Sequence, residues 1–168
     1  RDQPRSRGLG DVYKRQIMQQ AAARGLDIVF NPSPIDASIQ SLPLELVSLL
    51  VLNEIEGASL AGTEDESLVL EELRKQFPRC RILLTLGSRG CIYDDGTQRI
   101  QQKACSVEAV DTTAAGDTFT GYFVAADAAG LPPQECLLLA THAAAIAVSR
   151  PGAAPSIPVM AEVKQFSL

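Results

Sequence analysis

Three short, nearly continuous apolar runs constrain the fold of this 168-residue chain more than any other feature. They are LDIVFNP at Leu26–Pro32, LLVLN at Leu49–Asn53 and CRILLTLG at Cys80–Gly87. Such runs are typical of strands buried on both faces, as in parallel sheets. Because helical patterns alternate with them, we expect a three-layer αβα fold around a largely parallel central sheet.

The other expected elements continue this alternation. Helices are predicted where apolar residues recur at helical spacing or where an alanine-rich stretch ends at a glycine. These stretches are Ile17–Arg24, Pro43–Leu50, Glu54–Ala61, Glu64–Phe77, Gly116–Ala129 and Gln134–Ser149. Cys91–Ile100 is predicted to be a hairpin that turns at Asp94–Gly96, and Lys103–Val110 a further strand.

The first sixteen residues, RDQPRSRGLGDVYKRQ, differ from the rest of the chain. They are polar and basic, without clear amphipathic periodicity, and Ser6–Gln16 resembles the translation of a sequencing adapter. We therefore interpret residues 1–16 as a non-native tail and residues 17–168 as part of a larger domain. The alternative is a genuine basic arm that binds nucleic acid or a membrane surface.

Composition narrows the classes of function for the body of the chain. Residues 17–168 carry 10 basic and 18 acidic side chains, a net charge of −8, which does not attract nucleic acid. No apolar run is long enough to span a bilayer and no secretory signal is present, so we expect a cytoplasmic protein. The four scattered cysteines and single histidine argue against a zinc site; buried free thiols are favoured over a disulfide.

The segment DTTAAGDTFTG, Asp111–Gly121, carries the strongest chemical signal. It places Ala114, Ala115 and Gly116 at the start of a long predicted helix. The free backbone N–H groups and the dipole of a helix N-terminus attract an anion, and small side chains let a phosphate approach. Asp117 would then lie beside the phosphate, able to accept a proton from a substrate hydroxyl. The alternative is an acidic residue that merely favours the first helical turn.

This segment resembles the second signature of the PfkB carbohydrate kinases, and most closely that of the family's ribokinase-like members. The resemblance extends from Ile17 to about Val163. Further motifs follow in the family's order: NPSP at Asn31–Pro34, NEIE at Asn53–Glu56, TLGSRG at Thr85–Gly90 and AVSRPGAAPSIP at Ala147–Pro158. The resemblance implies a ribokinase-like αβα fold, of which the chain would be the C-terminal portion.

The resemblance also implies roles for individual residues. Asp117 would be the general base and contact both substrates, while the amides of Ala114, Ala115 and Gly116 would form an anion hole. ATP would be bound by Asn53, Thr85, Leu86, Gly87, Ser88, Arg89, Gly90, Gly116, Asp117 and Thr141. Glu56 would act on Mg²⁺ through water; the alternative for an N-x-x-E pattern is compensation of the helix dipole. His142 beside Thr141 is favoured as a structural residue.

Ribokinase-like members also bind K⁺ through carbonyl groups and a carboxylate. The positions in this sequence that match this site are Asp111, Thr113, Ala147, Arg150, Gly152 and Ser156. A turn rich in glycine and proline, such as RPGAAPS, can direct several carbonyl groups inward. The alternative is an ordinary loop that ends the domain.

The implied activity is ATP-dependent phosphorylation of a sugar hydroxyl, with ribose converted to ribose 5-phosphate, by a cytoplasmic protein whose parent is a homodimer. Alternatives are a family member that acts on fructose, a nucleoside or a related sugar, and a non-catalytic nucleotide-binding relative. In the family the sugar-binding residues come mostly from the N-terminal half, which this sequence lacks. We therefore expect the 168-residue chain to phosphorylate nothing by itself.

Overall fold

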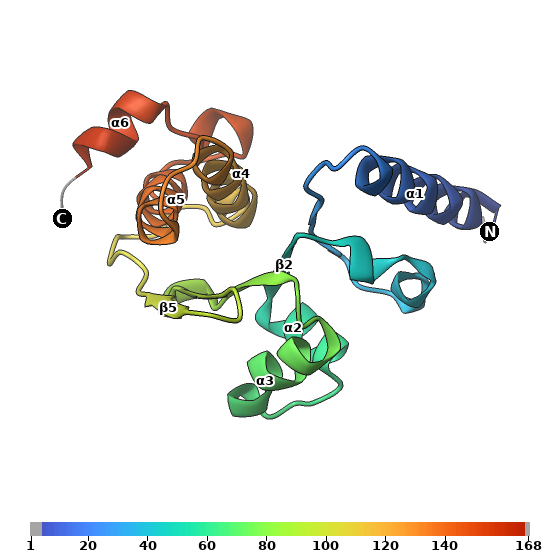
Figure 1. Cartoon of the computed structure of the whole chain (residues 1–168). Helices are drawn as coiled ribbons and strands as arrows, with labels where there is room; N and C mark the ends of the chain where they lie inside the picture. The colour runs from blue at the N-terminus through green and yellow to red at the C-terminus, as the bar shows by residue number, and fades with distance from the viewer. Residues whose placement is uncertain (1–4, 167–168) are drawn as a thin grey trace. The chain divides into compact units, whose positions relative to one another are not determined.

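The computed structural model describes residues 5–166, which divide into two compact units. The first comprises the residues up to Leu84 together with Asp94–Arg99, and the second comprises Thr85–Tyr93 and the residues from Ile100 onward. The strands of the described residues form a five-stranded sheet in the order β1-β2-β3-β4-β5. Alternating strands and helices confirm the predicted α/β class (Figure 1).

The first unit begins with helix α1, Arg5–Ala23, which starts twelve residues before the predicted helix. The prediction was wrong here because it required an amphipathic pattern. The side chains from Val12 to Ile17 are exposed, so this part of the helix buries no apolar face and shows none in its sequence. An Asp11–Lys14 ion pair at 3.5 Å spans one turn of this exposed stretch. The helix ends at Ala23, one residue before the predicted end, and Gly25, predicted to stop it, follows with a left-handed φ of 69°.

Two parallel strands follow in the first unit. Strand β1 is only Val29–Phe30, shorter than the predicted apolar run, and it pairs with Leu49–Leu50 of strand β2, Leu49–Asn53. The predicted helix over Pro43–Leu50 is wrong. A 3₁₀ turn, η2 (Leu44–Leu46), occupies its middle, after another, η1 (Ala37–Ser41). Leu49 and Leu50 instead belong to β2, where both are almost fully buried.

Helices α2 (Glu54–Ala61) and α3 (Glu66–Gln76) confirm two predicted helices, and β3 (Arg81–Thr85) confirms the third apolar run as a strand. Gly57 is the point of closest packing among them. A Cβ added to Gly57 would lie 2.8 Å from Leu84 Cδ1 and 3.3 Å from Val69 Cγ1. A larger residue at this position would push α2 away from the apolar side chains that it covers.

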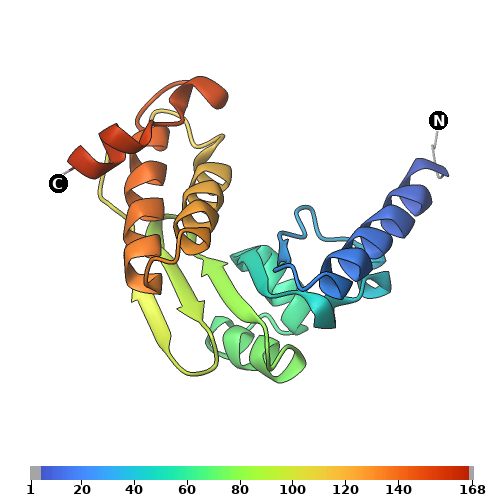
Figure 2. The same ribbon diagram turned by 45° about the horizontal axis from the view of Figure 1, so that its top comes forward.

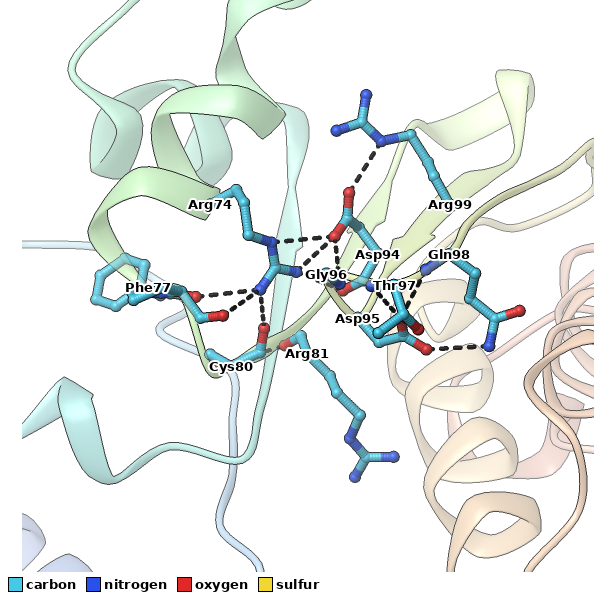
Figure 3. A network of polar contacts seen from close by, with 11 residues as sticks. Arg74, Phe77, Cys80, Arg81, Asp94, Asp95, Gly96, Thr97, Gln98 and Arg99 are labelled. Carbon is cyan, nitrogen blue, oxygen red and sulfur yellow. Dashed lines mark hydrogen bonds and ion pairs between the residues drawn. The ribbon is translucent and has the colours of Figure 1, made fainter.

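A polar network joins the end of α3 to the turn between β4 (Cys91–Asp94) and β5 (Arg99–Gln102) (Figure 3). Arg74 donates to Asp94 at 2.6 Å and to the Cys80 carbonyl at 2.7 Å. The Asp94 carboxylate also accepts from Arg99 at 2.9 Å and from the Gly96 amide at 2.9 Å. Asp94 is 5 % exposed, so these donors offset the cost of burying its charge.

The second unit is built around helices α4 (Ala115–Ala128) and α5 (Pro133–Val148), which lie side by side in Figures 1 and 2. Alanines buried along α5, such as Ala140 and Ala143, permit this close approach. Phe123 of α4 packs on Tyr93 with ring centroids 6.0 Å apart. The 3₁₀ turns η3 (Gly87–Arg89) and η4 (Ala154–Ser156) and helix α6 (Met160–Gln165) complete the unit.

The predicted hairpin over Cys91–Ile100 is confirmed, since β4 and β5 are neighbours in the sheet. The predicted strand over Lys103–Val110 is wrong, because this segment is irregular in the structure. Its last residue is instead tied to a helix end: the Val110 amide donates to the Val148 carbonyl at 2.7 Å.

The four cysteines, Cys80, Cys91, Cys105 and Cys136, are free thiols, as predicted. Within residues 5–166, no helix is long and apolar enough to cross a membrane.

Candidate active site

The second unit contains a cavity of about 330 Å³. Four stretches of chain line it: the loop after β3, the irregular segment before α4, the first turn of α4 and one face of α5. Small and aliphatic side chains make up most of its wall. A cavity of this size and character is typical of a site for a small organic ligand.

The loop after β3 contributes Thr85, Gly87, Ser88 and Gly90 to the cavity wall. The Leu86 amide donates to the Gly90 carbonyl at 2.7 Å, which folds the loop tightly back on itself. Leu86 and Arg89, also predicted to bind nucleotide, lie outside the lining of the cavity. The residues that line the cavity here therefore present mainly backbone and the hydroxyl-bearing side chains of Thr85 and Ser88 to a ligand.

Glycine is required at position 90 by two features of this loop. Its φ is 100°, a backbone conformation that other residues rarely adopt. A Cβ there would also collide with the Gln102 carbonyl oxygen and lie 2.7 Å from the Ala104 nitrogen. The loop can pass this close to the segment before α4 only because residue 90 has no side chain.

The start of α4 borders the cavity through Ala115 and Gly116. Its N-cap is Ala114, whose methyl group cannot cap the backbone N–H groups. A Cβ added to Gly116 would meet nothing within 4 Å, so the space in front of this helix end is open. Asp117 lies exposed in the same turn. The arrangement suits an anion placed at the helix N-terminus with a carboxylate beside it.

Helix α5 contributes a buried polar group to the cavity. Thr141 lines the cavity and is 5 % exposed, yet its hydroxyl has no hydrogen-bond partner among the described residues. A buried hydroxyl without a partner is costly, so a ligand that bonds to it would recover free energy. The neighbouring His142 packs on Phe166, with ring centroids 5.0 Å apart, which agrees with its predicted structural role.

Asp111 joins the loop before α4 to the loop after α5. Its carboxylate accepts hydrogen bonds from the Thr113 hydroxyl and amide and from the Gly152 amide, the last at 3.0 Å. These bonds hold the pKa of Asp111 below its usual value. The structure therefore brings together three of the residues predicted to hold K⁺.

The other predicted K⁺ positions have clear structural contacts. The Arg150 amide donates to the Ala147 carbonyl at 3.2 Å, and the Arg150 guanidinium pairs with Glu162 at 2.6 Å. The Ser156 hydroxyl, 1 % exposed, donates to the Ala153 carbonyl at 2.7 Å. Across the described part of the chain, no group of three or more His, Cys, Asp or Glu side chains could hold a metal ion.

The predicted magnesium and phosphate residues lie in the first unit. Asn53 and Glu56 form a reciprocal cap at the start of α2, in which each side chain accepts the other's backbone N–H at 2.9 Å. Glu56 is 4 % exposed. One carboxylate oxygen of Glu56 therefore accepts a hydrogen bond from the Asn53 amide at the helix start. The other is the oxygen that could bind a hydrated cation.

Sequence reasoning did not single out the segment from Ala104 to Ala109, which lines the cavity through Ala104, Cys105, Val107 and Ala109. Alternating small and apolar residues there also fit a strand, and nothing in the pattern marks a ligand wall. Phe119 of α4 also borders the cavity and was not predicted to do so.

The model of the pfkB family of carbohydrate kinases matches residues 6–160. Ribokinase from Schizosaccharomyces pombe is 38% identical over 154 residues, covering 87% of the chain and 48% of that relative. The chain thus spans about half the length of the curated relatives that it matches.

Two solved structures resemble the fold closely. One is ribokinase from Cryptococcus neoformans var. grubii in complex with ADP, with a TM-score of 0.83 and 29% sequence identity. The match covers 92% of this chain and 56% of the ribokinase chain. Ribokinase from Arabidopsis thaliana, complexed with ribose and ATP, has a TM-score of 0.81 at 30% identity, with coverages of 94% and 53%.

Proposed function

Because the chain belongs to the pfkB family of carbohydrate kinases, we propose that the protein from which it comes transfers the γ-phosphate of ATP to a sugar hydroxyl. The observation that carries the proposal is the open, uncapped start of α4 at the cavity, with Asp117 exposed in its first turn. Phosphoryl transfer needs an anion site and a base in one place.

Asp117 acts as the general base in this proposal. As the sugar oxygen bonds to the γ-phosphorus, the bond from that phosphorus to the β–γ bridging oxygen breaks and ADP leaves, while the hydroxyl proton passes to the Asp117 carboxylate. The amides of Ala114, Ala115 and Gly116 stabilise the negative charge that develops on the transferring group. Gly116 suits this position because its missing side chain leaves room for phosphate oxygens.

The cavity of the second unit holds the nucleotide. Thr85, Gly87, Ser88 and Gly90 border it through backbone and hydroxyl groups, and Leu86 and Arg89 keep their loop in shape. The unpartnered Thr141 hydroxyl bonds to a polar edge of the nucleotide. ATP is apt here because it combines a largely apolar base with the phosphates that α4 attracts.

Two cations complete the proposal. As the family resemblance implies, Glu56 would act through water on Mg²⁺ and Asn53 would bind phosphate; the ion would neutralise phosphate charge. K⁺ would be held where Asp111, Thr113 and Gly152 meet, with the carbonyl groups of Ala147, Arg150 and Ser156 as further ligands. The hydrogen bonds that Asp111 accepts from Thr113 and Gly152 support this, because they bring the two loops of the predicted K⁺ site together.

Ribose is the proposed acceptor, converted to ribose 5-phosphate. Support comes from the relatives, which are named ribokinases, and from the Arabidopsis structure with ribose and ATP. We further propose a cytoplasmic homodimer. Four free thiols, three of them buried, fit a reducing compartment.

The test is to assemble the complete reading frame and assay ATP-dependent phosphorylation of ribose, fructose and nucleosides, with and without K⁺. Asp117→Asn should lower kcat for the preferred sugar about a hundredfold to ten-thousandfold, because it removes the proton acceptor. Glu135→Gln is the matched control, since Glu135 is an exposed carboxylate in the first turn of α5. Full activity of Asp117→Asn would overturn the mechanism.

A further inference from the structure

Cys105 is the cysteine that borders the cavity of the second unit. Cys80, Cys91 and Cys136 are between 0 and 4 % exposed, whereas Cys105 is partly exposed and contributes to the cavity wall. A small reagent that enters the cavity therefore meets one thiol, while the other three are shielded by the core.

The environment of Cys105 is apolar and narrow. Its neighbours Ala104, Val107 and Ala109 line the same wall, and burial raises the pKa of the Cys105 thiol above its usual value. The thiol is therefore neutral at physiological pH and behaves as a small apolar part of the wall. A group attached to this sulfur takes up part of the cavity of about 330 Å³.

The Thr141 hydroxyl is an independent sign that this cavity receives a ligand. Thr141 borders the same cavity, and its buried hydroxyl has no hydrogen-bond partner in the described part of the chain. A polar group left in this state is costly in a protein without ligand and is satisfied when a polar edge arrives. A ligand that reaches Thr141 occupies the space that Cys105 borders.

We propose that Cys105 is a modification site within the nucleotide cavity: bound nucleotide covers its thiol, and alkylation of that thiol excludes the nucleotide. The inference rests on the proposed function, since it takes the cavity to be the ATP site. With iodoacetamide the Cys105 sulfur attacks the methylene carbon, a C–S bond forms, and the C–I bond breaks as iodide leaves with its electron pair. The thiol proton passes to solvent.

The experiment uses the full chain, iodoacetamide at about pH 8.5 to populate the thiolate, and peptide mapping by mass spectrometry. We expect Cys105 to be alkylated faster than the other three cysteines. When ATP occupies about nine-tenths of the sites, labelling of Cys105 should slow about tenfold, because only the free fraction reacts. ATP binding is measured separately by equilibrium dialysis.

The alkylated chain should lose ATP binding and keep its circular dichroism spectrum. The loss of ATP binding should follow the fraction of Cys105 that is alkylated in the peptide map, while Cys80, Cys91 and Cys136 stay unlabelled, which assigns the effect to this sulfur. Unchanged Cys105 labelling in the presence of bound ATP would overturn this inference and leave the proposed function standing. If untreated chain binds no ATP, the proposed nucleotide site fails, and the inference fails with it.

Discussion

Thr141 illustrates how a single buried oxygen can lower stability and still be useful. Its hydroxyl has no hydrogen-bond partner among the described residues, and the residue is buried, with only 5 % of its surface exposed. Thr118 on α4 has the same defect, with 3 % exposure, but it does not border the cavity. The two residues therefore allow the cost of an unsatisfied hydroxyl to be measured apart from its proposed use in binding.

Thr141→Val should raise the free energy of unfolding by about 1 kcal/mol, because it replaces an unsatisfied hydroxyl by a methyl group of similar size. The same change should weaken ATP binding about fivefold to tenfold through the lost hydrogen bond. Urea unfolding and equilibrium dialysis measure the two effects. The control Thr118→Val should raise stability alone. Unaltered ATP affinity of Thr141→Val would contradict a contact between this hydroxyl and the nucleotide.

Gly90 makes a second prediction at the scale of one residue. Gly90→Ala should lower the free energy of unfolding by about 2 kcal/mol or more, since a left-handed φ of 100° and a clash with backbone atoms act together. Gly121→Ala is the control, because Gly121 lies within α4 and its Cβ would meet nothing within 4 Å. That change should stabilise by about 0.5 to 1 kcal/mol. Equal effects in urea unfolding would contradict the packing argument.

At the scale of elements, Arg74 holds the end of α3 against the β4–β5 turn (Figure 3). Its guanidinium bonds to Asp94 and to the carbonyl oxygens of Phe77, Pro78 and Cys80. Arg99 also bonds to Asp94 but is half exposed. The two arginines share one carboxylate, yet they differ in burial and in the number of groups that depend on them.

Arg74→Met should destabilise the chain by about 3 kcal/mol, because it leaves partly buried carbonyl groups and one side of the buried Asp94 carboxylate without their donor. Arg99→Met should cost less than about 1 kcal/mol, since an exposed ion pair contributes little. Urea unfolding of both variants provides the comparison. A larger loss in Arg99→Met than in Arg74→Met would show that burial does not govern this network.

Asp94 also makes the stability of this network dependent on pH. Burial by itself raises the pKa of Asp94, but hydrogen bonds from Arg99, Gly96 and Arg74 together lower it below the usual value. The stabilisation is therefore complete above the unfolded value of about 4 and is lost as the pH falls through the lower folded value. Asp94→Asn should flatten the decline of unfolding free energy below about pH 4; an unchanged acid slope would rule out this carboxylate as its source.

Elements whose signals are local were predictable from the sequence. β2 and α2 occur at the residues predicted for them, since an apolar run leads directly into an Asn-x-x-Glu cap. Lys103–Val110 was predicted as a strand because alternation alone cannot tell a strand from a cavity wall. Thr141 was expected to bind ATP only because of the family resemblance. The proposed role of Cys105 depends on neighbours distant in sequence, so no local pattern could indicate it.

For the whole molecule, this chain contains the cavity of the proposed nucleotide site but lacks most of the residues expected to bind the sugar. The cavity, the start of α4 and Asp117 all belong to the second unit. The chain spans about half the length of its curated relatives, and the sugar-binding residues were expected in the other half. The 168-residue chain should therefore bind ATP without transferring phosphate, whereas the complete protein should do both.

We expect the 168-residue chain to bind ATP, because the cavity and the anion site are both present, and to transfer no phosphate to ribose, because Asp117 has no positioned hydroxyl to deprotonate. The complete protein should do both, and Asp117→Asn in it should preserve ATP binding while removing transfer. Equilibrium dialysis with ATP and a coupled ADP-release assay with ribose measure the two activities for each protein. Ribose phosphorylation by the 168-residue chain would show that the acceptor site, too, lies within these residues.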